Sequence, residues 1–405
     1  MGKDIGDTRE QVRNFKAKTI YDIFFNKELP NHFKKDNTWV NFGENLMIKP
    51  KYVFSDDCNN PVGYLIYKNS KFHVENKQGD LLNIKKPEES HFFNSPISID
   101  HLKAITKLAE KTKLKIKLFG QSHSWSPVHT TNGIFVDNRM INYYDGIERV
   151  LINPADERTN HPSISPDGQL RPTATCSPGI TSGQLETHLW ETSETKTVRY
   201  SMDSSTYEDV FTMAGMCFTS SHGTGRKTNC LSDFVVAMTF VTYNGEVIQI
   251  TPHECPNYLL YNEKKEKDMT PEDVWRAAQV NLGAYGIVYE MTVVISPQID
   301  AYFVTEVPRW DKYFADTDEA RGELFRLVNE WDCLEFWHYP FTFKDKKEDI
   351  KIKDILFAKV TNSPYVFITK SLSNKPPPGY TIIEKRPIDF YSTLLYMSVG
   401  KKKIS

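Results

Sequence analysis

The sequence contains no long apolar run and no large excess of charge of either sign. No segment approaches the roughly 20 apolar residues that a membrane span needs. The first residues, Met1–Asp4, open a charged stretch rather than the apolar core of a signal peptide. We therefore expect a cytoplasmic protein without a membrane span. Fifty basic against fifty-two acidic residues leave a formal net charge of -2, so bulk charge does not indicate a nucleic-acid partner.

Metal-site and common nucleotide motifs are also missing. The six cysteines, at positions 58, 176, 217, 230, 255 and 333, include no Cys-x-x-Cys pair. This spacing argues against a zinc site and is typical of a reducing compartment, and we expect no metal. Residues 223–228 resemble a Walker loop only briefly, because Arg226 intervenes before the lysine and the upstream glycine spacing is wrong. No Gly-x-Gly-x-x-Gly follows a strand, and no Gly-x-Ser-x-Gly elbow supports a hydrolase.

Length and composition are those of a soluble globular protein with more than one domain. Single cores stop growing well below 405 residues, and 39% hydrophobic with 25% charged residues is ordinary for a folded chain. Residues 1–90 are predicted to be an N-terminal extension followed by an irregular insertion with a short hairpin. Within these residues, the aromatic stretch 39–43 is the first segment that indicates a compact fold.

From Pro96 onward, the pattern predicts a mixed α/β block. Ser98 is a suitable N-cap for a helix. The apolar residues that recur at helical spacing after it are Ile99, Leu102, Ile105, Leu108 and Ala109. Alternation of leucine or isoleucine with lysine over 114–118 then predicts a half-buried strand, and further strands are expected at 134–136 and 150–152.

A second block repeats this order of elements. A strand over 173–176 precedes a helix over 181–190, and two β runs, 234–242 and 246–251, flank Asn244-Gly245, the strongest short hairpin signal. Thr270, Pro271 and Asp273 predict a capped helix that continues to Gly283. A strand over 287–295 closes the block, and a separate α+β region begins near residue 299.

Two glycine-containing loops are the candidate ligand-binding segments. One covers residues 120–127, directly after a predicted strand, and the other covers 220–225. Small residues allow the backbone to approach a ligand closely, and successive amides can form an anion-binding nest suited to a pyrophosphate. The same pattern also occurs in ordinary tight turns.

Six motifs in the correct order resemble the FAD-binding domain of the vanillyl-alcohol-oxidase (PCMH-type) superfamily. The most similar branch is that of the sugar-1,4-lactone oxidases (L-gulonolactone and D-arabinono-1,4-lactone oxidases) and alditol oxidase. The motifs lie at 120–127, 137–140, 177–179, 214–215 with 222–225, 241–247 and 282–287. The resemblance covers about residues 96–296, with weaker similarity at 39–43 and 335–340.

This resemblance implies an α+β fold with a two-subdomain FAD-binding domain over residues 91–298 and a C-terminal α+β substrate or cap domain over 299–405. The implied cofactor-binding residues lie mainly in and beside the two loops. They are Leu118, Phe119, Gly120, Gln121, Ser122, His123, Ser124, Thr212, Gly215, Thr219, Ser220, Ser221, His222, Gly223, Gly225 and Ile287. Ile287 matches a position whose backbone contacts the adenine end of FAD, while its side chain is expected in the core.

The family's first-loop histidine carries the flavin on its 8α-methyl carbon, and the match implies covalent attachment at His123. A neutral imidazole is a good nucleophile near pH 7. The glycine that usually precedes this histidine is Ser122 here, which brings a side chain to the flavin edge. His222, in the second loop, is expected to pack beside the flavin ring rather than act as a base.

Three further residues have simpler interpretations. Cys217 stands five positions before His222, and some members of the superfamily tether flavin through a second cysteine. We interpret Cys217 instead as a small buried hydrophobic residue. Asp137 and Arg139 form either an ion pair or solvated loop charges, and the second interpretation is preferred.

The candidate substrate-binding residues lie within 334–340, a segment that resembles the strand facing the flavin in sugar-lactone oxidases. Glu335 and His338 are the candidates for binding substrate hydroxyls, and strand alternation places them on opposite faces. Glu335 is the candidate catalytic residue. The family's closing His-Trp-Gly-Lys-like motif has no counterpart in residues 400–405, which implies a shortened or rearranged C-terminal domain.

The implied activity is oxidation of a carbinol in an aldonolactone or polyol by hydride transfer to FAD, with oxygen as acceptor and hydrogen peroxide as product. Two alternatives stay open. One is a dehydrogenase on the same fold that passes electrons to another acceptor. The other is a flavin-binding protein without a complete active site.

Overall fold

The computed structural model describes the chain from residue 33 to residue 373 with gaps. The described residues are 33–34, 36, 38–41, 46–58, 60–82, 92–141, 143–144, 147–148, 150–162, 164–192, 198–204, 206, 209–226, 228–260, 269–298, 301–306, 308–338 and 366–373. They fall into two compact units. The larger unit holds those within 29–222 and 229–297, and the smaller unit holds those within 223–228 and 298–373.

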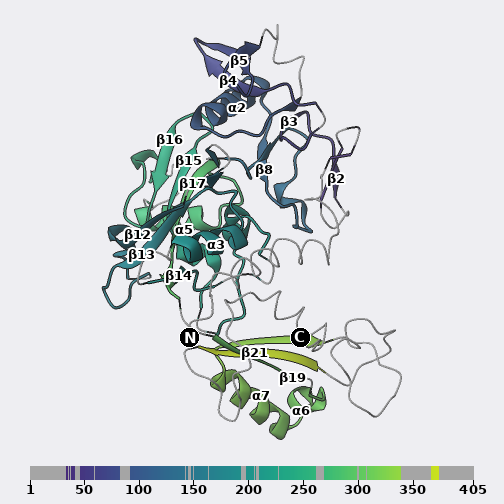
Figure 1. Ribbon diagram of the computed structural model, residues 1–405, viewed down its shortest axis with the longest axis vertical. Coiled ribbons are helices and arrows are strands. Elements are labelled where there is room, and N and C mark those ends of the chain that lie inside the picture. The colour runs from purple at the N-terminus through teal and green to yellow at the C-terminus, as the bar shows by residue number, and fades with distance from the viewer. Residues whose placement is uncertain are drawn as a thin grey trace, which may run out of the picture. The chain divides into compact units, whose positions relative to one another are not determined.

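A parallel sheet with strand order β7-β3-β9-β8 forms one part of the larger unit. Its strands are β3 (Tyr52–Phe54), β7 (Phe92–Phe93), β8 (Ile116–Phe119) and β9 (Ile134–Asp137). Two of its strands, β3 and β8, are labelled in Figure 1. Helix α2 (Ile99–Thr112) packs its apolar stripe on this sheet, and the Ser98 side chain accepts a hydrogen bond from the His101 backbone N–H. The predicted helix and its cap are confirmed. The unit starts earlier than the boundary expected at residue 91, because β3 is an inner strand of the sheet.

Short strands occupy the region that the sequence assigned to an irregular insertion. Strands β4 (Tyr64–Lys68), β5 (Lys71–Glu75) and β6 (Leu81–Leu82) form an antiparallel sheet, which confirms the expected hairpin. Strands β1 (Trp39–Val40) and β2 (Met47–Ile48), which come earlier in the sequence, pair with each other in antiparallel fashion. Trp39 is fully buried against Phe119 and Phe135, so this segment belongs to the core.

An antiparallel sheet of order β12-β13-β17-β15-β16 forms the other part of the larger unit. Its strands are β12 (Leu151–Asp156), β13 (Arg171–Cys176), β15 (Val235–Val241), β16 (Val247–Ile250) and β17 (Ile287–Val294). Helices α3 (Ser182–Thr192), α4 (Met213–Cys217) and α5 (Pro271–Gln279) pack in its core. The remaining short elements are strands β10 (Tyr143–Tyr144), β11 (Ile147–Glu148), β14 (Tyr200–Ser201) and β18 (Ser296–Pro297), and 3₁₀ turns Pro127–His129, Glu157–Thr159, Leu231–Phe234 and Asn257–Leu259.

Two local sequence signals in this sheet are confirmed and one boundary is corrected. The hairpin turns at Gly245, whose φ is 83°. Thr270 and Asp273 form the expected capping box of α5. The helix, however, ends at Gln279 and does not continue to Gly283. Leu282 and Gly283 have left-handed backbone conformations, with φ of 52° and 79°. This conformation cannot continue a right-handed helix.

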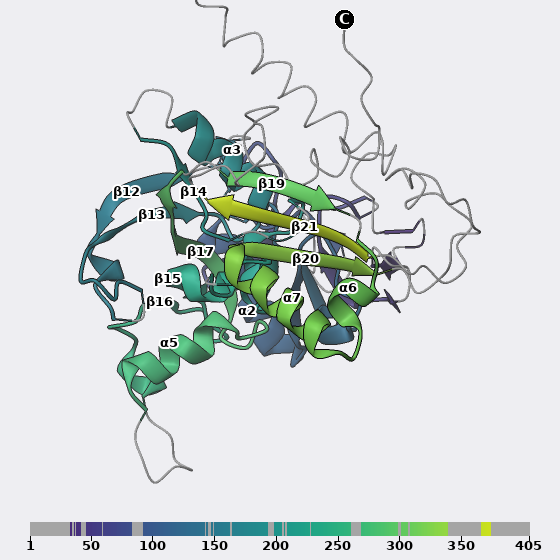
Figure 2. The same ribbon diagram turned by 90° about the horizontal axis from the view of Figure 1, so that it is seen from below.

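The smaller unit is an antiparallel sheet of order β19-β21-β20 with helices on one face (Figure 2). It comprises β19 (Ala301–Glu306), α6 (Asp311–Phe314), α7 (Asp318–Glu330), β20 (Cys333–His338) and β21 (Val366–Ser373). Leu334 and Phe336 of β20 pack against the helix residues Tyr313 and Leu327. None of the described helices has the length and apolar character needed to cross a membrane.

Candidate cofactor site

The first loop leaves the carboxyl end of β8 and is held close to the rest of the larger unit. A Cβ atom on Gly120 would lie 2.5 Å from Thr212 Oγ1, so only glycine permits this approach of the loop to the start of α4. Farther along, the Asn41 side-chain amide donates a hydrogen bond to the Ser124 carbonyl at 3.0 Å. Asn41 is almost fully buried and also accepts a hydrogen bond from the Leu46 backbone N–H.

Both candidate loops contain a serine in the left-handed backbone region. Ser122 has a φ of 59° and Ser220 a φ of 56°, a conformation that costs an L-residue about 1–2 kcal/mol relative to the right-handed region. This geometry explains why glycine is the usual residue of the family before the first-loop histidine. The Ser122 hydroxyl is buried and donates to the Gly120 carbonyl at 3.4 Å, so it turns back into its own loop.

The second loop continues from the short helix α4. Thr212 caps this helix by accepting a hydrogen bond from the Gly215 backbone N–H at 3.3 Å, and Thr219 Oγ1 donates to the Gly215 carbonyl at 2.8 Å. Ser221 N–H donates to the Met216 carbonyl. His222 follows with an exposed side chain. These bonds hold residues 212–221 in a compact turn structure.

Segments far apart in the sequence meet at these loops. The His123 ring packs edge-on against Phe211 with centroids 4.8 Å apart. Thr181 forms an antiparallel bridge with Thr212, and the Ala214 N–H donates to the Pro178 carbonyl at 3.0 Å. The first loop, the 177–181 turn and the start of α4 therefore form one continuous surface within the larger unit.

Several predicted cofactor-binding residues can contribute only their backbone. Phe119 is 2% exposed and stacks on Phe135, while Ile287 is 1% exposed at the start of β17. The core position expected for the Ile287 side chain is confirmed. Leu118 also packs against the hydrophobic core. Gln121 and Ser124, by contrast, are partly accessible in the first loop.

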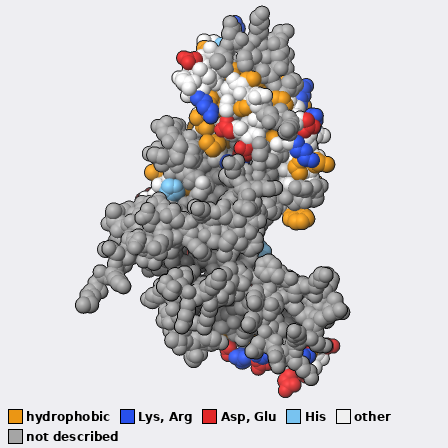
Figure 3. Space-filling model, turned by 45° about the vertical axis from the view of Figure 1, so that its right-hand side comes forward, with side chains coloured by type: hydrophobic (Ala, Val, Ile, Leu, Met, Phe, Trp, Pro, Cys, Tyr) orange, Lys and Arg blue, Asp and Glu red, His pale blue; other side chains and the backbone are white. Residues whose placement is uncertain are grey.

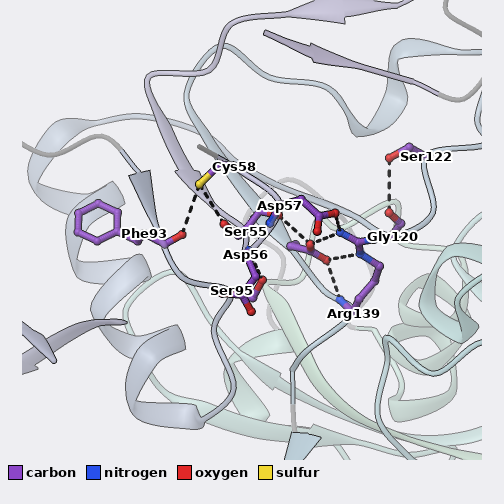
Figure 4. A network of polar contacts seen from close by, with 10 residues as sticks. Ser55, Asp56, Asp57, Cys58, Phe93, Ser95, Gly120, Ser122 and Arg139 are labelled. Atoms are coloured by element: carbon purple, nitrogen blue, oxygen red, sulfur yellow. Dashed lines mark hydrogen bonds and ion pairs between the residues drawn. The ribbon is translucent and has the colours of Figure 1, made fainter. Parts of the chain in front are cut away.

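Asp137 and Arg139 are not solvated loop charges, so that interpretation is wrong. Asp137 is 1% exposed. Arg139 Nε donates to Asp137 Oδ1 at 2.9 Å, and its guanidinium also contacts Asp57 (Figure 4). The Ser55 hydroxyl donates to Asp137 Oδ2 at 2.9 Å. Burial alone would lower the pKa of Arg139, but the charges and hydrogen bonds of the two carboxylates outweigh it and raise this pKa.

Cys217 has the environment of a small buried hydrophobic residue, which confirms its interpretation. It is completely buried, and its thiol donates weakly to the Leu231 carbonyl at 3.7 Å. Burial raises the pKa of the Cys217 thiol to about 12. Because the thiolate is the nucleophilic form, this environment disfavours a second flavin tether.

Glu335 lies on β20 of the smaller unit, on the sheet face opposite Leu334 and Phe336, which pack on the helices. It is half-buried and stands opposite Thr369 of β21. Two further predicted residues, Gly223 and Gly225, also belong to this unit, and Gly225 forms an antiparallel bridge with Cys333, the first residue of β20. The His338 side chain lies outside what the structure describes.

Sequence reasoning missed two asparagines at the first loop. Asn41 lies in the aromatic stretch 39–43 and Asn138 in the motif 137–140, and neither pattern singles out the asparagine. Asn138 is 4% exposed, and no donor among the described residues reaches its Oδ1 atom. A Cβ on Gly120 would lie 3.2 Å from that oxygen. A close-approach glycine beside a buried acceptor fits a polar ligand such as FAD.

Comparison with known proteins identifies the larger unit. Residues 92–251 match the family model described as FAD binding domain. This region therefore resembles PCMH-type FAD-binding domains, and the chain is similar to sugar-lactone oxidases and dehydrogenases. An L-gulono-1,4-lactone dehydrogenase of Mycobacterium tuberculosis (strain ATCC 25618 / H37Rv) is 24% identical over 249 residues, which cover 62% of this chain and 46% of that protein. An L-gulonolactone oxidase of Mus musculus is 24% identical over 244 residues, covering 58% and 44%.

The matched region thus spans about half the length of the curated relatives. Among solved structures, the cholesterol oxidase of B. sterolicum aligns with a TM-score of 0.49 and 16% identity, over 70% of this chain and 45% of that chain. Among the described residues, no group of three or more histidine, cysteine, aspartate or glutamate side chains could hold a metal ion.

Proposed function

We propose that this protein is an FAD-dependent oxidase that oxidises a carbinol carbon of a sugar lactone or polyol and carries its flavin covalently on His123. The observation that supports it most is the meeting of the His123 loop, the 177–181 turn and the start of α4 around Gly120, inside a domain that matches the FAD-binding family. The curated relatives are named for L-gulonolactone, which supports a sugar lactone as substrate.

Each residue in the proposal has a distinct task. Phe211 packs on the His123 ring and would restrict its rotation, which favours one orientation for bond formation. The loops of residues 118–124 and 212–225 would hold FAD, while bound flavin would accept the hydride. Glu335 would bind a substrate hydroxyl. Oxygen would reoxidise the cofactor and yield hydrogen peroxide.

The cysteines and the surface charge support a proposed location and proposed partners. All six cysteines are free, which supports a cytoplasmic location. On the face of the larger unit seen in the upper part of Figure 3, lysine and arginine side chains lie among aspartate and glutamate side chains. This mixed surface favours small neutral partners, namely the lactone or polyol and oxygen, over a nucleic acid.

Covalent attachment is tested by acid precipitation of the purified protein. A histidyl bond survives denaturation, whereas hydrogen bonds and stacking do not, so the pellet should stay yellow. The His123→Ala variant should release all its flavin into the supernatant. Release of all flavin from the parent protein would disprove attachment at His123 but would leave FAD binding intact.

The reaction is tested by anaerobic mixing with L-gulono-1,4-lactone, other aldonolactones and polyols, followed by exposure to oxygen. We expect bleaching of the flavin and rapid recovery with oxygen. Glu335→Gln should slow reduction roughly ten- to a hundredfold, because a charged hydrogen bond that strengthens in the transition state contributes about 1.5–3 kcal/mol. Its flavin content and oxygen reaction should not change.

One relative is named a dehydrogenase, and the same experiment separates that alternative. Fast bleaching followed by slow recovery with oxygen, but fast recovery with a quinone or dye, would identify a dehydrogenase. A yellow protein that no lactone or polyol bleaches would instead favour a flavin-binding protein without turnover.

A further inference from the structure

Hydrogen bonds and close packing hold the Asn138 backbone in place. Its N–H donates to the Phe119 carbonyl at 2.9 Å, at the end of β8, and its own carbonyl accepts a hydrogen bond from Ile141 N–H at 3.3 Å. On the other side, a Cβ on Gly179 would lie 2.1 Å from this carbonyl. Asn138 therefore sits where β8, β9 and the 177–181 turn meet, and it has little freedom to move away.

The residues on either side of Asn138 strengthen this constraint. Asp137 and Arg139 belong to the buried ion network that also includes Ser55 and Asp57 (Figure 4). A buried ion pair resists local rearrangement, because moving the two charges apart leaves a buried charge without compensation. The network thus holds the backbone from which the Asn138 carboxamide projects.

The carboxamide itself has an unmet requirement. Buried polar atoms in proteins nearly always have a hydrogen-bond partner, yet no described donor reaches Asn138 Oδ1, although the residue is 4% exposed. A Cβ on Gly120 would lie 3.2 Å from Oδ1 and 2.5 Å from Thr212 Oγ1. The unmet acceptor therefore lies directly beside the first loop.

We propose that the Asn138 carboxamide is a cofactor-binding group that forms a hydrogen bond with a polar N–H or O–H group of FAD. This inference rests on the FAD binding proposed above and adds a residue that the motif comparison does not supply. FAD offers such donors on its ring, its ribityl chain and its adenosine. Because the first loop covers Oδ1, a group seated against this loop is better placed to donate than bulk water.

A ligand-binding role and a purely structural role predict opposite effects of Asn138→Leu. Leucine has the same branched shape at Cγ, is somewhat larger, and has no polar atom. If the carboxamide serves FAD, its removal weakens FAD binding and leaves the FAD-free protein as stable as before or more stable, because a buried acceptor without a partner is eliminated. If its role is structural, the FAD-free protein loses stability and its affinity for FAD is retained by the folded fraction.

The experiment uses His123→Ala as the parent, because FAD must dissociate for its affinity to be measured. The dissociation constant of FAD, from titration of FAD fluorescence, is compared between this parent and the same chain with Asn138→Leu. We expect an increase of about tenfold, the effect of one net hydrogen bond. The thermal midpoint without FAD should not fall, and the rise in midpoint at a fixed FAD excess should shrink.

The matched control is Ser165→Ala, which removes a different buried polar group without a described partner, a hydroxyl in the connection between β12 and β13. It should leave the affinity for FAD unchanged. Asn138→Ala serves as the second variant if the leucine variant does not fold, with the same expected weakening. An FAD dissociation constant within twofold of the parent in either folded variant overturns the inference alone. No FAD binding by the unmodified protein would overturn the proposed function as well.

Discussion

Replacing Arg139 with methionine should destabilise the larger unit strongly, because it removes the cation that pairs with the buried Asp137 carboxylate and with the partly exposed Asp57 carboxylate. Asp137 is 1% exposed, and Arg139 has a side chain that is 13% exposed. The guanidinium contacts both Asp137 and Asp57 (Figure 4). Methionine keeps most of the aliphatic volume, so the change removes charge with little loss of packing.

The magnitude follows from what remains around Asp137. Removing one partner of a buried ion pair typically costs about 3–5 kcal/mol, since the other charge stays buried without compensation. Here the Ser55 hydroxyl and the backbone N–H of residue 139 still donate to the Asp137 carboxylate at 2.9 and 3.0 Å. Asp57, with a side chain 34% exposed, can be solvated. We therefore expect the lower end of the range, about 3 kcal/mol, against a total of roughly 5–15 kcal/mol for ordinary domains.

Urea unfolding, followed by circular dichroism and tryptophan fluorescence, measures this effect. Asp57→Asn should cost much less than Arg139→Met, and Arg326→Met, in an exposed ion pair of α7, should leave the midpoint unchanged. The double variant Asp137→Asn with Arg139→Met should recover part of the loss, because no carboxylate then stays buried at position 137. A cost below about 1 kcal/mol for Arg139→Met would refute the argument, since that is the range of exposed pairs.

Four other substitutions, one of them a control, test three separate features of the molecule. Gly120→Ala places a Cβ 2.5 Å from Thr212 Oγ1, so it should lower the free energy of unfolding by about 1–3 kcal/mol and reduce flavin content. The control Gly322→Ala in α7, where no atom lies within 4 Å of the added Cβ, should raise that free energy by about 0.5–1 kcal/mol. Thermal unfolding measures stability, and flavin absorbance measures flavin content. Burial lowers the pKa of His101 from 6.5 to about 4. The contribution of His101 to the free energy of unfolding is therefore complete above pH 6.5 and declines as the pH falls toward 4. In urea titrations, His101→Asn should remove on the order of 3 kcal/mol of this pH dependence. Ser122→Gly, at a φ of 59°, should increase the free energy of unfolding by up to about 1 kcal/mol and so raise the thermal midpoint slightly, without loss of flavin. A lower midpoint would contradict the assigned strain.

Local signals in the sequence predicted the elements that depend on neighbouring residues. Ser98 before α2, Gly245 in the hairpin and the Thr270 capping box each act within about four residues, and all three are present. Strand β3 was missed because it has only three residues and pairs with β7 and β9, which lie far along the chain. Such non-local pairing leaves little trace in a short segment.

The same limit explains the errors at the candidate site. Asp137 and Arg139 look like surface charges in sequence, because the residues that bury and pair them, Ser55 and Asp57, stand 82 positions earlier. Asn41 reaches the Ser124 carbonyl over 83 positions. The loops themselves were recognisable from their motifs, while the side chains that support them from other segments were not.

Ser122 shows how a departure from a family pattern can keep the geometry of that pattern. From sequence, a side chain next to His123 was expected at the flavin edge. In the structure, the backbone keeps the left-handed angle that favours glycine, with a φ of 59°. The hydroxyl points back to the Gly120 carbonyl and is buried. This hydrogen bond offsets part of the conformational cost, and it joins the close-approach glycine to the residue that precedes His123. The substitution is therefore compatible with a flavin at His123, because the serine directs its side chain into the loop.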